Sequence, residues 1–331
     1  MSIKKNPKIV VIGGGTGTFV ALSGLKKYPL ELTAVVTMMD DGGSSGRLRD
    51  ELGVLPPGDV RQSLVALAKS SKLLREMFNY RFEGGELKGH AFGNIFLSTL
   101  SKTTGSMKKA IEEVGKILQI QGRVVPVTYA KSDLCVEFAD GKIIKGETHI
   151  DEVENREKRA RIKRAFLQPR INANPDAIKV IKNADVIIVG PGDLYTSIIP
   201  NLLVTNIKSA INKSKAKKIY VLNLMTKYGQ TTGHTAKDHV EDLEQYVGKN
   251  VLDVVLVNTK TPRQKALAWY KDFGEHPVKD NLGKNCNFSI VRKNLIKDVI
   301  LHHSPSDPLR RSIIRHDSEK LAKAIMQIIT E

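Results

Sequence analysis

Short apolar runs alternate along the chain with amphipathic stretches of helical spacing. The runs that predict strands lie at 9–12, 32–37, 185–189, 219–223 and 251–258. Each has the length of a buried strand and is followed by apolar residues at helical intervals. Right-handed crossovers between successive strands then give a mostly parallel sheet covered by helices on both faces. The pattern therefore predicts a Rossmann-like, doubly wound α/β fold.

Between the second and third of these runs the pattern changes. Residues 70–119 are predicted to be mainly helical, and a β-rich embellishment is expected at about 123–168. Within it, 134–138 and 142–145 form a hairpin around an Asp140-Gly141 turn. Further helices are expected at 175–183, 234–247, 261–270 and 318–329, whereas 272–301 has no clear pattern. Because no linker or repeat interrupts the chain, we expect a single domain over 1–331.

The first apolar run ends abruptly in glycines. Backbone N–H groups at the start of a helix have no intrahelical partner, and glycines let an anion approach them closely. We therefore expect a phosphate at this turn. The glycine spacing does not fit the dinucleotide fingerprint, and the lysine-bearing phosphate loop of P-loop NTPases is absent. The candidate ligands are Gly13, Gly14, Gly15, Thr16, Gly17 and Thr18.

The second predicted strand runs into another turn of small and charged residues. Its candidates for ligand binding are Asp41, Gly42, Gly43, Ser44 and Arg47. In a parallel doubly wound sheet both turns open at the carboxyl edge, where ligands bind. The alternative is that both are ordinary tight turns with solvated charges.

Later turns repeat the combination of glycines with polar side chains. The further candidates are His90, Asn94, Gly190, Gly192, Asp193, Thr196, Ser197, Asn223, Thr226 and Arg315. His90 and Asn94 are four residues apart and could share one face of a helix entrance, although a lone histidine is commonly structural. Arg315 and His316 precede the predicted N-cap at Asp317 or Ser318, and their side chains can face solvent or a ligand.

Asp40 and Asp59 are candidate metal ligands. Asp59 follows a Pro-Pro-Gly turn, where an acidic residue is also an ordinary N-cap or first-turn residue of a helix. The alternative is that Asp59 joins Asp40 or Asp41 around Mg²⁺, which favours a few carboxylates together with waters and phosphate oxygens.

The composition is that of a globular protein with a strong positive charge. The 331 residues are 41% hydrophobic, and Lys plus Arg exceeds Asp plus Glu by 52 − 35 = 17. The dense basic run Arg156–Arg164 has no interleaved aromatics, so we interpret it as a solvated helix face and expect no specific nucleic acid partner.

No apolar stretch approaches membrane-spanning length and no signal peptide is evident, which indicates a cytoplasmic protein without membrane contact. Cys135 and Cys286 have no zinc or disulfide spacing.

Several long motifs in order resemble one family. GGGTG, DDGGSSGRLRDELGVLPPGDVRQSLVALA, GHAFGN and GPGDLYTSIIPNLL are similar to the bacterial gluconeogenesis factor family, within the larger group that contains the 2-phospho-L-lactate transferases. The resemblance implies a regulatory factor that binds a nucleotide, namely a UDP-sugar, and supports cell shape and wall synthesis during gluconeogenic growth. The transferases place acidic residues in the loops of Asp40 and Asp59, which favours Mg²⁺ there.

The sequence departs from the family pattern at two positions. Asp193 stands where serine is common, and Gln230 stands where relatives carry glutamate. Loss of that carboxylate leaves open any role it has elsewhere as a base or metal ligand.

Three functions compete. The first is the UDP-sugar-binding factor without rapid turnover, and the second is a transferase that uses a nucleoside-diphosphate-linked donor and a divalent metal. The third, an NAD-dependent oxidoreductase with Asp40 on the ribose, is disfavoured by the misplaced third glycine. The residues themselves do not identify the nucleobase or the attached sugar. They also leave open whether the protein is a monomer or a homo-oligomer.

Overall fold

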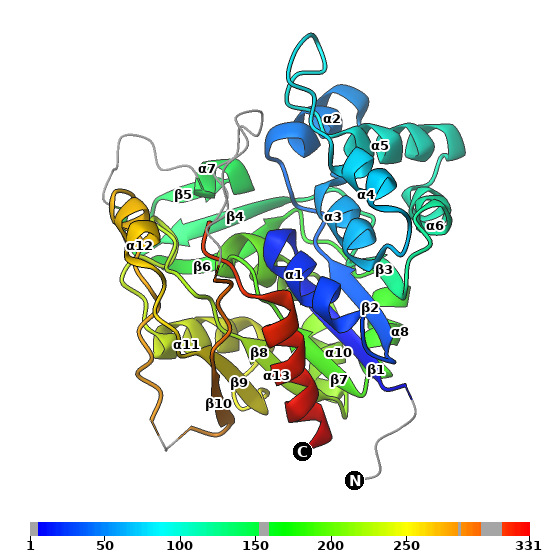
Figure 1. Cartoon of the computed structure of the whole chain (residues 1–331). Helices are drawn as coiled ribbons and strands as arrows, with labels where there is room; N and C mark the ends of the chain where they lie inside the picture. Colours follow the sequence, from blue (N-terminus) through cyan, green and yellow to red (C-terminus); the bar gives the residue numbers. More distant parts are fainter. Residues whose placement is uncertain (1–5, 152–158, 284–285, 299–312) are drawn as a thin grey trace.

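The computed structural model describes residues 6–151, 159–283, 286–298 and 313–331. Its centre is a seven-stranded sheet with the order β10-β9-β8-β7-β1-β2-β3, in which every neighbouring pair is parallel (Figure 1). The strands are β1 (Lys8–Gly13), β2 (Glu31–Val36), β3 (Arg123–Pro126), β7 (Val186–Val189), β8 (Lys217–Val221), β9 (Val254–Asn258) and β10 (Ser289–Lys293). The order reverses between β1 and β7, so a topological switch point lies between these two strands.

Alternate residues of the central strands divide the core into two layers. Ile9 and Val11 of β1 face one apolar cluster, whereas Val10 and Ile12 face the other. The first cluster is covered by α1 (Gly15–Leu25), α3 (Gly58–Leu67), α5 (Phe92–Thr104), α6 (Met107–Ile117) and α13 (Ser318–Thr330). The second is covered by α8 (Pro175–Lys182), α9 (Ile199–Leu203), α10 (Ile207–Lys213) and α11 (Ala236–Val247). The predicted doubly wound α/β fold is confirmed.

A second, antiparallel sheet packs into the α8–α11 layer. It has the order β5-β4-β6 and consists of β4 (Asp133–Phe138), β5 (Ile143–Lys145) and β6 (Ile162–Gln168). The predicted hairpin is β4–β5, and the short helix α7 (Glu147–Asp151) follows it. The predicted embellishment at 123–168 is divided, because β3 pairs with β2 as the edge of the main sheet.

The interpretation of Arg156–Arg164 as a helix face is wrong for its last residues. Residues 162–164 belong to β6, and Lys163 and Arg164 are exposed on this strand. Both bind Glu137 on the neighbouring strand β4, at 2.9 and 2.6 Å. The segment forms a strand because pairing with β4 gives Lys163 and Arg164 a cross-strand partner, Glu137, and places Ile162 in the core. Residues 156–158 lie outside the described part of the chain.

Of the remaining helices, those at 72–79 and 264–271 agree with the predicted pattern with small shifts of their ends, whereas those at 43–52 and 194–198 begin within segments predicted as turns. These elements are α2 (Gly43–Leu52), α4 (Lys72–Asn79), α12 (Gln264–Lys271) and a π-helical turn, η2 (Leu194–Ile198). Asp317 is the N-cap of α13 and accepts hydrogen bonds from the N–H groups of Glu319 and Lys320. Within the described residues, no helix combines the length and the apolar character needed to cross a membrane.

Candidate functional site

A cavity of about 510 Å³ opens at the carboxyl ends of β1, β2, β7 and β8. The turns that follow these strands form much of its wall, as expected for a doubly wound sheet. The predicted ligand-binding and metal-binding residues on this wall are Gly14, Gly15, Thr16, Gly17, Asp40, Gly42, Ser44, Asp59, Asn94, Gly192, Asp193, Ser197, Asn223, Thr226 and Arg315. Residues from both ends of the chain, Gly14 and Arg315, therefore share one cavity.

At the switch point the turns after β1 and β7 are in direct contact. A Cβ added to Gly17 would lie 2.3 Å from the carbonyl oxygen of Pro191, so only glycine allows this approach. Gly15 has φ +61° and open space around it, with Ser197 Oγ 3.7 Å from the position of a Cβ. Gly17 is thus required by packing between the turns, and Gly15 by its backbone conformation.

Asp59 reaches into the first glycine turn. Its Oδ1 accepts a hydrogen bond from the N–H of Gly15 at 2.7 Å, and a Cβ on Gly14 would lie 2.3 Å from its Oδ2. The N-cap of α3 is Pro57, which has no side-chain cap, and Asp59 lies in the first turn of that helix. Asp59 is therefore a first-turn residue, not the N-cap, and its carboxylate connects α3 to the turn after β1.

Ser44 links α2 to α5. Its Oγ accepts hydrogen bonds from the N–H of Ala91 at 3.2 Å and from Nδ2 of Asn94 at 3.1 Å, and it lies 3.2 Å from Nδ1 of His90. His90 is buried behind Ser44 and does not line the cavity. Burial, followed by the charge of Arg47, lowers the pKa of His90. His90 thus supports Ser44 and Asn94 as a neutral side chain.

The other predicted residues that do not line the cavity are Gly13, Thr18, Asp41, Gly43, Arg47, Gly190 and Thr196. Arg47 donates to the carbonyl of Lys88 at 2.7 Å. The hydroxyl of Thr18 is fully buried, and a Cβ on Gly13 would lie 2.5 Å from it. Gly43 and Gly190 adopt positive φ angles at the turns they belong to. These residues do not contact the cavity, but they belong to the segments that form its wall.

Helix α7 brings carboxylates that the sequence pattern did not indicate. Glu147 and Asp151 line the cavity together with Asp40 and Asp59. Burial, reinforced by the charges of Asp40, Asp151, Asp59 and Asp41, raises the pKa of Glu147 well above its ordinary value. Burial also raises the pKa of Asp151 to about 6, which Lys227 opposes. This side of the cavity is strongly acidic.

Asp41 positions α7. Its Oδ1 accepts hydrogen bonds from the backbone N–H of Thr148 at 2.8 Å and from the Thr148 hydroxyl at 2.9 Å. A carboxylate at the N-terminus of a helix satisfies an otherwise unpaired N–H and opposes the helix dipole. The predicted ligand residue Asp41 therefore has a structural role here, because it holds the helix that carries Glu147.

The contact between Gln230 and Asp151 explains why an amide, and not a carboxylate, stands at position 230. Its side chain is buried, and Nε2 donates a hydrogen bond to Oδ1 of Asp151, which also accepts one from the hydroxyl of Thr196 at 3.3 Å. A glutamate at this position would place a second carboxylate against Asp151. The amide therefore avoids repulsion between two buried carboxylates.

Cationic side chains line the cavity as well. Arg61 is buried and donates to Oδ1 of Asn94 at 2.9 Å and to Oδ1 of Asn79 at 2.5 Å. Arg81 lies on the same wall, and Lys227 is 3.8 Å from Asp193. None of these three was predicted from the sequence, because no motif separates them from the general excess of basic residues. Together with Arg315 they provide positive charge at several points of the wall.

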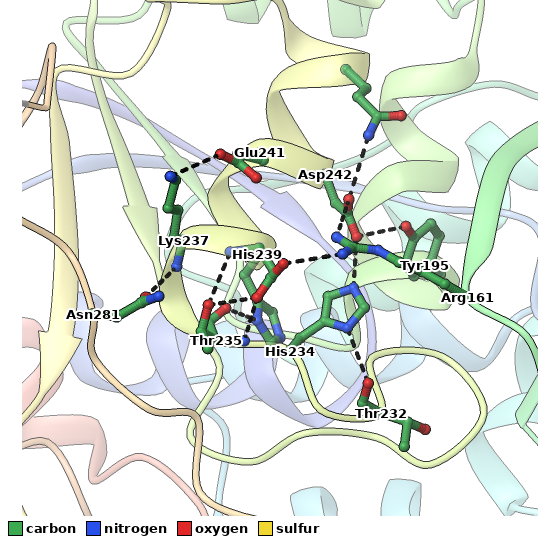
Figure 2. Close-up of polar contacts among 12 residues, drawn as sticks. Arg161, Tyr195, Thr232, His234, Thr235, Lys237, His239, Glu241, Asp242 and Asn281 are labelled. Carbon is green, nitrogen blue, oxygen red and sulfur yellow. Dashed lines mark hydrogen bonds and ion pairs between the residues drawn. The ribbon is translucent and has the colours of Figure 1, made fainter.

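Asp242 is the centre of a polar network that joins α11 to three other segments (Figure 2). Asp242 Oδ2 lies 2.8 Å from Nε2 of His234 and accepts a hydrogen bond from the Tyr195 hydroxyl at 2.8 Å. Its Oδ1 lies 3.1 Å from a guanidinium nitrogen of Arg161. Asp242 of α11 thereby ties the turn after β7 to the loop after β8 and to the approach to β6. The network was not predicted, since these residues are far apart in sequence.

Comparison with known proteins agrees with the fold and the motifs. Residues 9–296 match the family model of the 2-phospho-L-lactate transferase CofD. A putative gluconeogenesis factor of Thermotoga maritima is 46% identical over 322 residues, with 97% of this chain and 99% of that protein covered. The gluconeogenesis factor of Bacillus subtilis is 40% identical over 329 residues, with 99% of each covered.

A solved structure is also similar. The crystal structure of protein BH3568 from Bacillus halodurans has a TM-score of 0.88 and 38% sequence identity, and the match covers 97% of this chain and 100% of that one. The chain therefore belongs to the 2-phospho-L-lactate transferase CofD family, among the members named gluconeogenesis factors.

Proposed function

We propose that this protein is a cytoplasmic factor that binds a nucleoside diphosphate sugar of the UDP-sugar class and supports wall synthesis and cell shape during gluconeogenic growth. One observation carries the nucleotide part of this proposal. The glycine turns after β1 and β7 meet at the switch point and form one wall of a single cavity. Backbone N–H groups at such turns suit phosphate, and the family resemblance supplies the nucleobase.

The charge of the wall suits a ligand with phosphates and a polar extension. Arg61, Arg81, Lys227 and Arg315 offer cations for the diphosphate, while the carboxylates favour hydroxyl groups or a metal ion. Asp40 and Asp59 lie on the wall and fit Mg²⁺, which keeps waters and needs only a few carboxylates beside phosphate oxygens. The described residues hold no group of three or more His, Cys, Asp or Glu side chains arranged for a metal ion. The phosphate would therefore have to complete the coordination.

A transferase reaction is the second candidate. The family model and the carboxylates with raised pKa, Glu147 and Asp151, favour it. Asp151, whose pKa is raised to about 6, can accept a proton from an acceptor hydroxyl, while a metal ion and the arginines would stabilise charge on the phosphates. The two candidates share the cavity and differ in turnover.

A melting panel tests the nucleotide assignment. A ligand at a hundredfold excess over its Kd stabilises the folded protein by about 2.7 kcal/mol, which raises Tm by several degrees. We expect UDP-sugars to raise Tm more than NAD or a free sugar, and the nucleotide that co-purifies with the protein to be uridine-based. A panel in which NAD exceeds every UDP-sugar would refute the assignment. Steady release of nucleoside monophosphate from a defined donor would replace the binding factor with the transferase.

A further inference from the structure

The wall of the cavity contains two hydrogen-bond acceptors that have no partner, one on Asn223 and one on His316. Asn223 follows β8, and His316 precedes α13; both residues line the cavity. Oδ1 of Asn223 and Nε2 of His316 are buried atoms with no hydrogen-bond partner in the described part of the chain. The imidazole of His316 hydrogen-bonds to the backbone of Leu222, the residue before Asn223, so His316 and Asn223 lie in the same part of the cavity wall.

His316 presents its Nε2 as an acceptor. The hydrogen bond to Leu222 raises the pKa and is therefore donated by a ring N–H to the carbonyl oxygen. Because Nε2 has no partner, the donor is Nδ1, and this bond fixes the tautomer. Burial, the larger cause, lowers the pKa of His316 to about 4. The ring is neutral at physiological pH, with a lone pair on Nε2.

The direction of the Asn223 amide is also fixed. Its Nδ2 donates to the carbonyl oxygen of Gly192 at 2.8 Å. Rotation of the amide would place Oδ1 against that carbonyl, and two acceptors repel each other. The oxygen of Asn223 is therefore held as an acceptor, and the same side chain is anchored to the turn after β7.

A buried acceptor without a partner is costly, so an unpaired acceptor that lines a cavity is suited to a donor on a ligand. Leaving such a group unpaired costs about 1–3 kcal/mol, and proteins retain few of them. The proposed ligand supplies donors in two places, the hydroxyl groups of its sugar rings and the imide N–H of a uracil base. The anchor on Gly192 places Asn223 beside the glycine turns that suit the diphosphate, and sugar rings are the parts attached directly to a diphosphate.

We infer that Asn223 Oδ1 and His316 Nε2 are specificity determinants that accept hydrogen bonds from neighbouring hydroxyls of a sugar ring attached to the diphosphate. This inference rests on the proposed function and deepens it. It assigns a hydroxyl-bearing ring, not the base, to the part of the cavity between β8 and the start of α13. A site built on two acceptors discriminates strongly against an analogue that lacks the donor.

The test combines ligand analogues with variants of His316. Calorimetric titration would compare the best UDP-sugar with its 2′-deoxy, 3′-deoxy, hexose-deoxy and N3-methyl-uracil analogues. His316→Phe removes the acceptor and keeps a planar ring, whereas His316→Gln keeps an acceptor. His239→Phe is the matched control, because His239 is also buried with an unpartnered Nε2 but does not line the cavity. Melting curves establish that each variant is folded.

We expect one of the deoxy analogues, the one that lacks the hydroxyl bound by His316, to bind the wild type about tenfold more weakly than the parent UDP-sugar. His316→Phe should bind the parent ligand weakly to a similar degree and no longer distinguish parent from analogue, since both changes remove the same hydrogen bond. His316→Gln and His239→Phe should keep the discrimination. Additive losses for every deoxy analogue would overturn the inference and leave nucleotide binding intact. Non-additivity with only the N3-methyl analogue would assign the acceptors to the base, and failure of all nucleotides to bind would overturn both proposals.

Discussion

The carboxylate of Asp59 accepts a hydrogen bond from the backbone N–H of Gly15 at 2.7 Å, across 44 residues of sequence. One of the N–H groups expected to face a phosphate is therefore already paired with a negatively charged oxygen. A phosphate at this turn would meet that charge at close range, and a cation between them would relieve the repulsion. The contact connects the predicted phosphate site with the predicted metal site.

Two substitutions separate the structural role of Asp59 from a metal role. Asp59→Asn keeps an oxygen that can accept from Gly15, so we expect stability within about 1 kcal/mol of the wild type. If Asp59 also holds Mg²⁺, the variant loses the enhancement of nucleotide binding by Mg²⁺. Asp59→Ala should lose both stability and the Mg²⁺ effect. Titrations with and without Mg²⁺ measure this, and an unchanged Mg²⁺ response in Asp59→Asn would exclude the metal role.

Gly15→Val should impair the turn itself. The φ of +61° disfavours any residue with a Cβ, and a left-handed conformation costs about 1–2 kcal/mol for an ordinary residue. The branched side chain would also project from a residue that lines the cavity. We expect a lower Tm and no stabilisation by UDP-sugars. Gly84→Val is the control, because a Cβ there meets nothing within 4 Å; an equal loss of ligand response in the control would contradict the prediction.

Asp242→Ala should be much more harmful than Tyr195→Phe. The alanine variant leaves Nε2 of His234 and the hydroxyl of Tyr195 without their partner in the interior, and each buried polar group left unpaired costs about 1–3 kcal/mol. Tyr195→Phe removes one hydrogen bond, worth about 1 kcal/mol. Urea unfolding measures both values. Equal losses in the two variants would mean that Asp242 does not organise the network.

The stability of the protein should fall in mild acid partly because of His239. Burial lowers the pKa of His239 from 6.5 to about 4. As the pH falls from about 6.5 toward about 4, the unfolded chain binds a proton that the folded protein excludes, so the free energy of unfolding decreases. His239→Phe should flatten this part of the pH profile. Denaturation at pH 7.5 and pH 5 in both proteins measures the difference, and parallel profiles would contradict the assignment.

The excess of 17 positive charges should cause only weak, sequence-independent DNA binding. Such binding depends on counterion release and weakens steeply from low to physiological salt. Fluorescence anisotropy with two unrelated duplexes over a salt series measures it. Tight binding of one duplex at 0.15 M salt would contradict the expectation of no specific nucleic acid partner.

Local patterns were sufficient for most of the fold. The buried runs of β1, β2, β7, β8 and β9 are continuous apolar stretches, and a strand covered on both faces has this signature. β10 was not recognised, because it is an edge strand whose residues are exposed or half-buried. The start of β6 was misassigned for the same reason, because the exposed Lys163 and Arg164 suggested a solvated helix. Their partner, Glu137 on β4, is known only from the tertiary structure.

The sequence by itself determined the parallel sheet and the glycine turns at its carboxyl edge, because strand periodicity and turn composition are local properties. Only the tertiary structure decided which polar residues share the cavity. Asp41 faces Thr148 of α7 instead of the cavity, and Glu147 and Asp151 enter the cavity from this short helix, which follows β5 of the second sheet. The physical reason is that the position of α7 depends on contacts across more than a hundred residues, and no local pattern carries the partners of such contacts.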